Sequence, residues 1–534
     1  MARMKVAYSD DASVLSVLEA ADAVDTVHRF LDWTTERIPI DYWALLSACP
    51  DVCMYRTSAG EIMGQRLEPG DRSVFTRGMD VLLQQGTDLL QIYLDNLHDK
   101  GIKVLAEIRM SDTHHKDHLW EIEGCPIFSI EHPQYAIRRH DGVKEVALDY
   151  SHAEVREHRL AIMRELATER DVDGLELNFM RWAKHFERDR GPEKAPIMTG
   201  FVGAIRGMLD DAARKRGVDR LVLGARVAST IDENLLLGCD VTAWIRRGYL
   251  DYVVPSEHNC TWPALNVEQF AGPAQGTGCE VYAMMGDMIG GSWTGKPEPD
   301  DRPVGTAPMW RGYHSMLNTP EEARGSAYNY YAAGAQGIGF WNTPNNCNPY
   351  GSRQPNNHNQ WERMLGWMRE VYDPERIEAG ARRYHYIPIY KDDWTAVGAN
   401  YKYRESGRSM HGAFKGKTLY FNEGLRGTRQ VYPFRMADGR GGGPLRGTLR
   451  YRIIHGSDDD RFDTDINGAT VATRHVKRTV HAHDPEMSWT WAEIDLGDCP
   501  PFRFDNELGI TWRSDTAGRS EVPYLEELDI RVQP

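Results

Sequence analysis

The chain has 534 residues, 41% of them hydrophobic and 26% charged, which is ordinary for a globular protein but too long for one hydrophobic core. We therefore expect two or three domains. The net charge of −15 disfavours a nucleic-acid partner, and the sequence has no run of eighteen apolar residues that would predict a membrane span.

The opening residues, MARMKVAYSDDASVL, lack the charged-then-apolar layout of a secretory signal. We expect a cytoplasmic protein, with secretion left open in case a signal peptide has been removed.

The first two thirds of the chain alternate between predicted helices and short predicted strands. Helices are predicted at 14–38, 77–99, 152–169, 196–216, 239–248 and 320–333. Strands are predicted at 42–49, 103–110, 146–150, 174–179, 221–227, 252–257, 280–285 and 337–342. Eight strand–helix units in series are typical of a closed (β/α)8 TIM barrel. An open doubly wound sheet is the alternative, but no glycine-rich phosphate-binding sequence follows the first predicted strand.

The pattern changes near residue 380. Short alternating runs such as KTLYFN, GTLRYRIIH and MSWTWAEIDL follow, separated by turns rich in Gly, Asp and Pro. This pattern predicts an all-β sandwich. We therefore predict a barrel catalytic domain over 1–380 and a C-terminal β-sandwich domain over 381–534. The sandwich could contact carbohydrate, brace the barrel or form a homo-oligomer.

The stretch DVDGLELNFMRW (171–182) contains the fourth predicted strand. Its apolar residues alternate with Glu176 and Asn178, so one face of the strand is polar. Arg181 and Trp182 follow where a loop would begin. Polar residues at the C-terminal end of a barrel strand usually lie where substrate binds. The alternative is a partly exposed strand in which Glu176 pairs with Arg181.

Polar residues recur at the C-terminal ends of the other predicted strands. Acids gathered at one end of a barrel cost free energy unless they are paired or used. The residues of this predicted ring are Glu107, Arg109, Asp112, His114, His115, Asp149, Glu176, Asn178, Arg226, Glu257, His258, Asp287, Trp341 and Asn342.

Several carboxylates with aromatic neighbours suit the cleavage of a glycosidic bond. One carboxylic acid protonates the leaving oxygen, and a second carboxylate attacks the sugar or activates water. We assign Glu176 to this pair, with Glu257 or Asp287 as its partner because we expect strands six and seven to lie across the barrel from strand four. For each acid the alternative is an ion pair with an arginine.

The remaining residues of the ring are assigned to substrate binding. Three arginines near the site suggest an acidic or sulfated sugar, although pairing between Arg and Glu explains them as well. The predicted substrate-binding residues are Glu107, Arg109, His114, His115, Asp149, Asn178, Arg181, Arg226, His258, Trp341 and Asn342.

A metal site around His114 and His115 is the weaker interpretation. Adjacent histidines point to opposite sides, so both rarely bind one ion, although Asp112 or Asp149 could complete a site for a divalent ion. We predict no metal and no cofactor.

Three segments carry a resemblance to a known group. IRMSDTHH, ALDYSHAEVREHRL and DVDGLELNFMRW resemble bacterial glycoside-hydrolase-like barrel proteins related to the glycosyl hydrolase-like 10 group, over roughly residues 25–370. The resemblance implies a TIM barrel that acts on a carbohydrate. Such relatives often carry Asp where this chain has Asn178. Either Glu176 is then the working carboxylate, or the activity has been lost or relocated.

We therefore predict a glycoside hydrolase acting on an oligo- or polysaccharide. Two other classes stay open: a non-catalytic carbohydrate-binding protein, and a metal-dependent hydrolase or lyase acting on a sugar.

Overall fold

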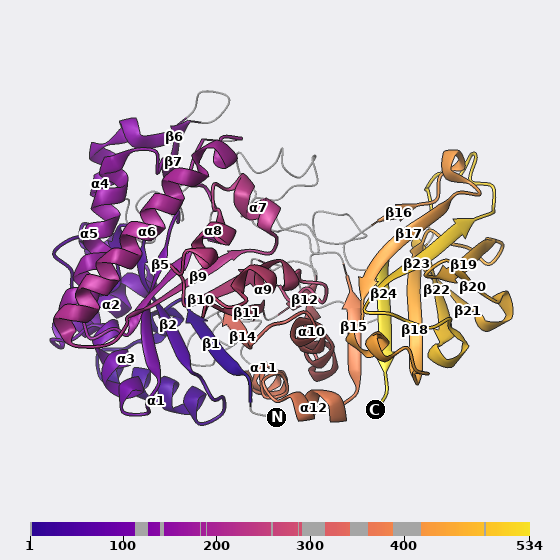
Figure 1. Cartoon of the computed structure of the whole chain (residues 1–534), viewed down its shortest axis with the longest axis horizontal. Helices are drawn as coiled ribbons and strands as arrows, with labels where there is room; N and C mark the ends of the chain where they lie inside the picture. Colours follow the sequence, from indigo (N-terminus) through magenta and orange to yellow (C-terminus); the bar gives the residue numbers. More distant parts are fainter. Residues whose placement is uncertain are drawn as a thin grey trace.

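The computed structural model describes residues 3–112, 126–138, 144–181, 183–187, 189–257, 260–286, 288–290, 316–341, 361–387, 418–484 and 487–534. Its N-terminal part is a closed barrel of eight parallel strands (Figure 1). The barrel closes because the first strand pairs with both the second and the last. The strands are β1 (Lys5–Asp10), β2 (Tyr42–Cys49), β5 (Lys103–Arg109), β8 (Gly174–Asn178), β9 (Val222–Ala228), β10 (Tyr252–Ser256), β11 (Glu280–Met285) and β14 (Gly337–Trp341). The predicted barrel is confirmed.

One predicted barrel strand is wrong. The segment 146–150 does contain a strand, β7 (Lys144–Leu148), but β7 pairs antiparallel with β6 (Ala136–Arg138) in a separate two-stranded sheet. The first barrel strand is β1, which was not predicted, and 42–49 is the second. Local sequence predicted the strand but not its partner. With β1 included, β8 remains the fourth strand of the barrel.

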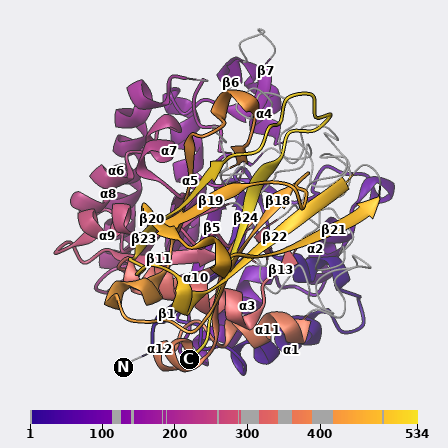
Figure 2. The ribbon, with the colours of Figure 1, turned by 90° about the vertical axis from the view of Figure 1, so that its right-hand side faces the viewer.

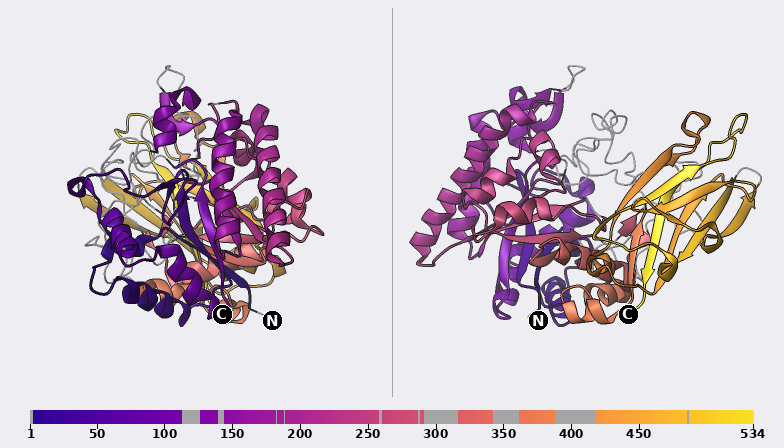
Figure 3. Two further views of the ribbon diagram at one scale, coloured as in Figure 1. Left: turned by 90° about the vertical axis from the view of Figure 1, so that its left-hand side faces the viewer. Right: turned by 45° about the vertical axis from the view of Figure 1, so that its right-hand side comes forward.

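Helices surround the barrel on its outer side (Figures 1 and 3). The predicted helix 77–99 is two helices, separated near Gly86, whose φ of 84° suits glycine. The predicted helix 14–38 begins with a separate 3-10 turn, Ser13–Val17, before its α-helix. The helices are α1 (Ala23–Thr35), α2 (Val74–Gln84), α3 (Leu89–His98), α4 (Ile127–Glu131), α5 (Ala153–Glu169), α6 (Gly191–Arg216), α7 (Ile231–Leu236), α8 (Val241–Arg246), α9 (Glu268–Ala274), α10 (Pro320–Ala332), α11 (Trp361–Met368) and α12 (Pro374–Ala379). Within the described part, no helix is long and apolar enough to cross a membrane.

A repeated contact fixes the N-terminal face of the barrel. Directly before every second strand stands a residue whose side chain accepts a hydrogen bond from a backbone N–H on the preceding strand. The backbone N–H of the accepting residue, in return, donates to the backbone carbonyl of the residue on that preceding strand. The four pairs are Asp41 with Val6 (2.8 Å), Asp173 with Val104 (2.8 Å), Asp251 with Leu223 (2.7 Å) and Gln336 with Val281 (2.9 Å). We call these four residues the basal ring. The ring ties the strands together in pairs and fixes their register.

The basal ring gives a stability prediction. Asp173→Ala would remove the acceptor of the fully buried Val104 N–H. An unsatisfied buried donor costs about 1–3 kcal/mol, so the free energy of unfolding should fall by that amount. Denaturant unfolding measures it. Asp219→Ala, at an exposed position, is the control; an equal loss in both variants would contradict the assigned role.

The C-terminal part is an all-β sandwich (Figure 2). Trp512 lies in its core, stacked on Phe421 and Phe462 with ring centroids 4.7 and 5.7 Å away. One sheet contains β15 (Arg382–Tyr386), β24 (Tyr524–Val532), β18 (Gly447–Ile454), β22 (Met487–Asp495) and β21 (Lys477–Asp484), with β16 (Leu419–Tyr420) beside β24. The other contains β17 (Arg429–Arg435), β23 (Asp505–Trp512), β19 (Phe462–Ile466) and β20 (Ala469–Val471).

Candidate functional site

Polar side chains fill the C-terminal half of the barrel interior. On β5, Leu105 belongs to the interior cluster, whereas Val104 and Ala106 pack on the outer helices. Because side chains alternate along a strand, Glu107 and Arg109 face inward with Leu105. The strand register sets Glu107 beside Glu176. The inner polar layer, as we name this group, contains Ser9, Glu107, Arg109, Glu176, Asn178, Arg226 and Trp341, all at most 3% exposed.

Glu107 is surrounded by donors. One of its carboxylate oxygens accepts from Ser9 Oγ and the other from Asn178 Nδ2 at 2.9 Å. The Arg109 Nε lies 3.9 Å from the second oxygen. Burial raises the pKa of Glu107, and the charge of Arg109 opposes that rise. The donors stabilise the ionised form of this carboxyl group.

Glu176 has a different environment. Its Oε2 accepts from the Tyr252 hydroxyl at 2.5 Å, and its Oε1 is buried with no hydrogen-bond partner among the described residues. Burial, and then the charge of Glu107, raise the pKa of Glu176 to about 8, against the opposing effects of Tyr252 and Arg226. Glu176 is therefore protonated at neutral pH, as a general acid must be.

The arginines lie at the same end of the barrel. Arg109 donates to Asp112 at 2.7 Å and also to Asp11. The predicted substrate residues Arg226 and Arg181 both lie near the Trp341 ring, with guanidinium carbons 4.5 and 5.7 Å from its centroid.

Arg226 donates to Ser256 Oγ at 3.0 Å and to the Glu257 carbonyl at 3.2 Å. Burial lowers the pKa of Arg226 to about 10, so the side chain is still a cation at neutral pH.

Two expectations about the ring need correction. Asp149 follows β7, which is outside the barrel, and its carboxylate accepts from the Ser151 N–H at 2.7 Å. It is therefore not at the end of a barrel strand.

Strands six and seven are also not opposite strand four: β10 is two strands from β8, and β14 is the strand across the barrel. The geometric reason for choosing Glu257 or Asp287 was therefore wrong, although Glu257 is buried just after β10.

The other predicted site residues lie outside the described residues. They are His114, His115, Trp182, His258, Asp287 and Asn342. Their roles, and the metal alternative around His114, stay predictions. In the described ranges, no group of three His, Cys, Asp or Glu side chains could hold a metal ion.

Three residues near the site were not predicted. Ser9 and Asp11 come from β1 and the turn after it, and Tyr252 is the first residue of β10. The signal for Ser9 was the alternating run KVAYSD near the start of the chain, and Asp11 directly follows that run. Nothing in the sequence around Tyr252 marks it as the partner of Glu176.

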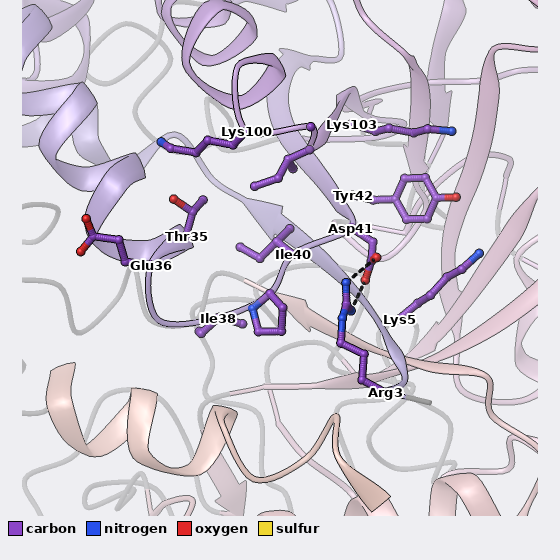
Figure 4. A pocket seen from close by; sticks show the side chains of 13 residues that line it. Arg3, Lys5, Thr35, Glu36, Ile38, Ile40, Asp41, Tyr42, Lys100 and Lys103 are labelled. Atoms are coloured by element: carbon purple, nitrogen blue, oxygen red, sulfur yellow. Dashed lines mark hydrogen bonds and ion pairs between the residues drawn. The ribbon is translucent and has the colours of Figure 1, made fainter. Parts of the chain in front are cut away.

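A cavity of about 660 Å³ lies at the opposite, N-terminal face (Figure 4). Basic side chains line it, and carboxylates pair with two of them: Arg3 with Asp41 at 2.8 Å and Lys5 with Glu280 at 2.8 Å. Substrates of TIM barrels bind at the C-terminal face. We therefore interpret this cavity as part of the structural base of the barrel.

The fold and site together define a TIM barrel with two inward carboxyl groups and a C-terminal sandwich. No family model and no curated protein matches the chain. Among solved structures, alpha-L-fucosidase isoenzyme 2 from Paenibacillus thiaminolyticus is similar at 12% identity and a TM-score of 0.40, over 72% of this chain and 51% of that one. The chain thus spans about half the length of that fucosidase.

Two further solved structures are similar. The PgaB (BpsB) glycoside hydrolase domain from Bordetella bronchiseptica has 10% identity and a TM-score of 0.39, over 70% of this chain and 99% of that one. A GH27 β-L-arabinopyranosidase from Geobacillus stearothermophilus has 11% identity and a TM-score of 0.36, over 97% and 98%.

The raised pKa of Glu176 predicts a pH effect on stability. Its folded pKa of about 8 lies above the value near 4.5 of an unfolded Glu, so its contribution is lost as pH rises between them. Glu176→Gln, which cannot ionise, should gain stability relative to wild type between pH 5 and 8. The expected gain exceeds about 1.4 kcal/mol, the equivalent of one pKa unit. Denaturant unfolding at both pH values tests it; a difference independent of pH would contradict the assignment.

Proposed function

We propose that the protein is a glycoside hydrolase in which Glu176 is the general acid and Glu107 the partner carboxylate. The observation that carries the proposal is the pair itself: a proton-holding Glu176 beside a donor-rich Glu107 on adjacent strands. One carboxyl group that gives a proton and a second carboxylate beside it are what glycosidic cleavage requires. Glu257 and Asp287 stay as alternative partners for Glu176.

The proposed reaction has two steps, and Glu176 and Glu107 act in both. Glu176 gives its proton to the glycosidic oxygen as the bond to the anomeric carbon breaks. Glu107 attacks that carbon and forms a glycosyl ester. Water, deprotonated by Glu176, then hydrolyses the ester and restores both groups. Because the sugar is displaced twice, first by Glu107 and then by water, we propose retention of configuration.

The neighbouring residues would position these groups and the sugar. Asn178 donates to Glu107 through Nδ2 and accepts from the Met180 N–H at 3.0 Å through Oδ1, so its amide orientation is fixed. In this proposal Asn178 does not replace a nucleophilic Asp but orients the adjacent carboxylate. Trp341 would offer a flat face to a sugar ring, and Arg181 and Arg226 beside it would favour an acidic or sulfated sugar.

Hydrolysis of a panel of aryl glycosides and acidic and neutral oligosaccharides tests the proposal. Glu176→Gln and Glu107→Gln should each lower kcat by about 10²–10⁴-fold, because each removes a group that acts in the transition state. Chelator should have no effect, and the first product should keep its anomeric configuration. Glu154→Gln, on the exposed face of α5, is the control.

The same panel separates the alternatives. A larger loss in Glu257→Gln or Asp287→Asn than in Glu107→Gln would move the partner role to that residue. Sugar binding without turnover in wild type would indicate a carbohydrate-binding protein instead. Loss of turnover with chelator would indicate a metal-dependent enzyme.

A further inference from the structure

His385 lies where the sandwich meets the barrel. It belongs to β15, the first strand of the sandwich, and is fully buried. Its Nδ1 is 2.7 Å from Glu322 of barrel helix α10, and its Nε2 is 2.9 Å from Glu527 of β24. Ionised carboxylates only accept hydrogen bonds, so both ring nitrogens must carry protons. His385 is therefore an imidazolium that bridges the two domains.

Glu322 has a second contact that extends this bridge into the barrel. Its Oε2 accepts from the Thr319 N–H at 2.9 Å, and its own N–H donates to Thr319 Oγ1 at 3.3 Å. This reciprocal pair is the capping box that starts α10. The carboxylate that His385 contacts is thus the one that fixes the first turn of the helix.

The residue before that cap contacts the exit of the seventh barrel strand. Asn318 Nδ2 donates to the Gly286 carbonyl at 2.7 Å and to Thr261 Oγ1 at 3.1 Å, and Thr261 donates to the same carbonyl at 3.0 Å. A second link is apolar: Ile387, directly after β15, packs on Ile289. Gly286 and Ile289 stand on either side of Asp287 in the sequence. The sandwich therefore contacts one flank of a predicted catalytic position directly, through Ile387, and the other only indirectly, through Glu322, Thr319 and Asn318.

We propose that His385 is a positioning residue through which the sandwich domain orders the strand-seven exit at the mouth of the barrel. The contacts are independent of the reaction. Their relevance to catalysis rests on the part of the proposed function in which Asp287 is an alternative partner of Glu176. The sandwich would then serve the site by fixing a segment of the barrel rather than by contacting sugar itself.

The bridge should depend on pH. The charged groups that face His385 are Glu322 from α10, Arg383 from its own strand, and Glu527 and Asp529 from β24; Arg452 from β18 pairs with Glu527. Burial and Arg383 lower the pKa of His385, but the carboxylates outweigh them and raise it above its usual value. The stabilisation is complete below the unfolded pKa of about 6.5 and is lost as pH rises through the higher folded value. Deprotonation removes the His385 hydrogen bond to one of the two carboxylates, which keeps only its other partners: Arg383 and the Thr319 N–H at Glu322, or Arg452 at Glu527.

Hydrogen–deuterium exchange of the full chain tests the proposal without any substrate. After correction for intrinsic exchange at each pH, segments 282–290 and 316–325 of the wild type should lose about tenfold protection between pH 6 and 9. His385→Gln should show the low protection at every pH. Glu527→Gln keeps an acceptor but removes a negative charge, so its transition should move to lower pH. His475→Gln is the matched control, because it removes a sandwich histidine that pairs with Asp498 at 2.7 Å away from the barrel.

Hydrogen exchange tests this proposal separately from the proposed function, because the experiment measures protection of the two segments and no turnover. Wild-type protection of both segments in His385→Gln would overturn the proposal, as would an equal loss across the whole chain. If His385→Gln does not fold, the Glu527→Gln variant decides. An unchanged pH midpoint for the loss of protection in that variant would overturn the proposal.

Discussion

A carboxylate inside a closed barrel must be surrounded by donors, and the inner polar layer is arranged around this requirement at Glu107. Ionised groups are costly to bury unless hydrogen bonds replace their water. Ser9 and Asn178 donate those hydrogen bonds from two other strands, and the charge of Arg109, 3.9 Å away on the same strand, adds a favourable interaction. One consequence falls on Glu176. Among the described residues Glu176 has a single donor, Tyr252, and burial together with the charge of Glu107 raises its pKa to about 8, which favours the protonated form.

The fold was largely predictable from sequence, because its strands and helices have local signals. The barrel, the strand containing Glu176 and the all-β C-terminal region follow from hydrophobic periodicity alone. The exceptions are β1, which was not predicted, and β7, which was predicted as a barrel strand. β1 begins with Lys5 near the start of the chain, and its inward Ser9 gives no apolar signal, whereas β7 has a good strand sequence but pairs elsewhere. Periodicity identifies a strand, but pairing depends on contacts far apart in the chain.

The site was predictable only in part, for the same reason. Alternation alone placed Glu176 and Asn178 on the inner face of one strand. The neighbours that set their chemistry come from other strands: Asn178 contacts Glu107, 71 residues earlier, and Glu176 contacts Tyr252, 76 residues later. No local pattern encodes a register between such segments. The signal that could have been used is the recurrence of Asp or Gln directly before alternate strands, since the basal ring fixes those registers.

The two faces of the barrel therefore have different physical tasks. At the N-terminal face the basal ring satisfies strand N–H groups, and carboxylates pair with Arg3 and Lys5 of the nearby cavity. That face can fix the strands without help from the interior. The C-terminal half can then hold groups that do not stabilise the fold, such as the buried Glu176 Oε1. Because those groups weaken the barrel at the end where substrate would bind, contacts from outside the barrel stabilise it most at that end. His385 makes such a contact through Glu322, and the capping box of Glu322 lies next to Asn318, which contacts the exit of strand seven.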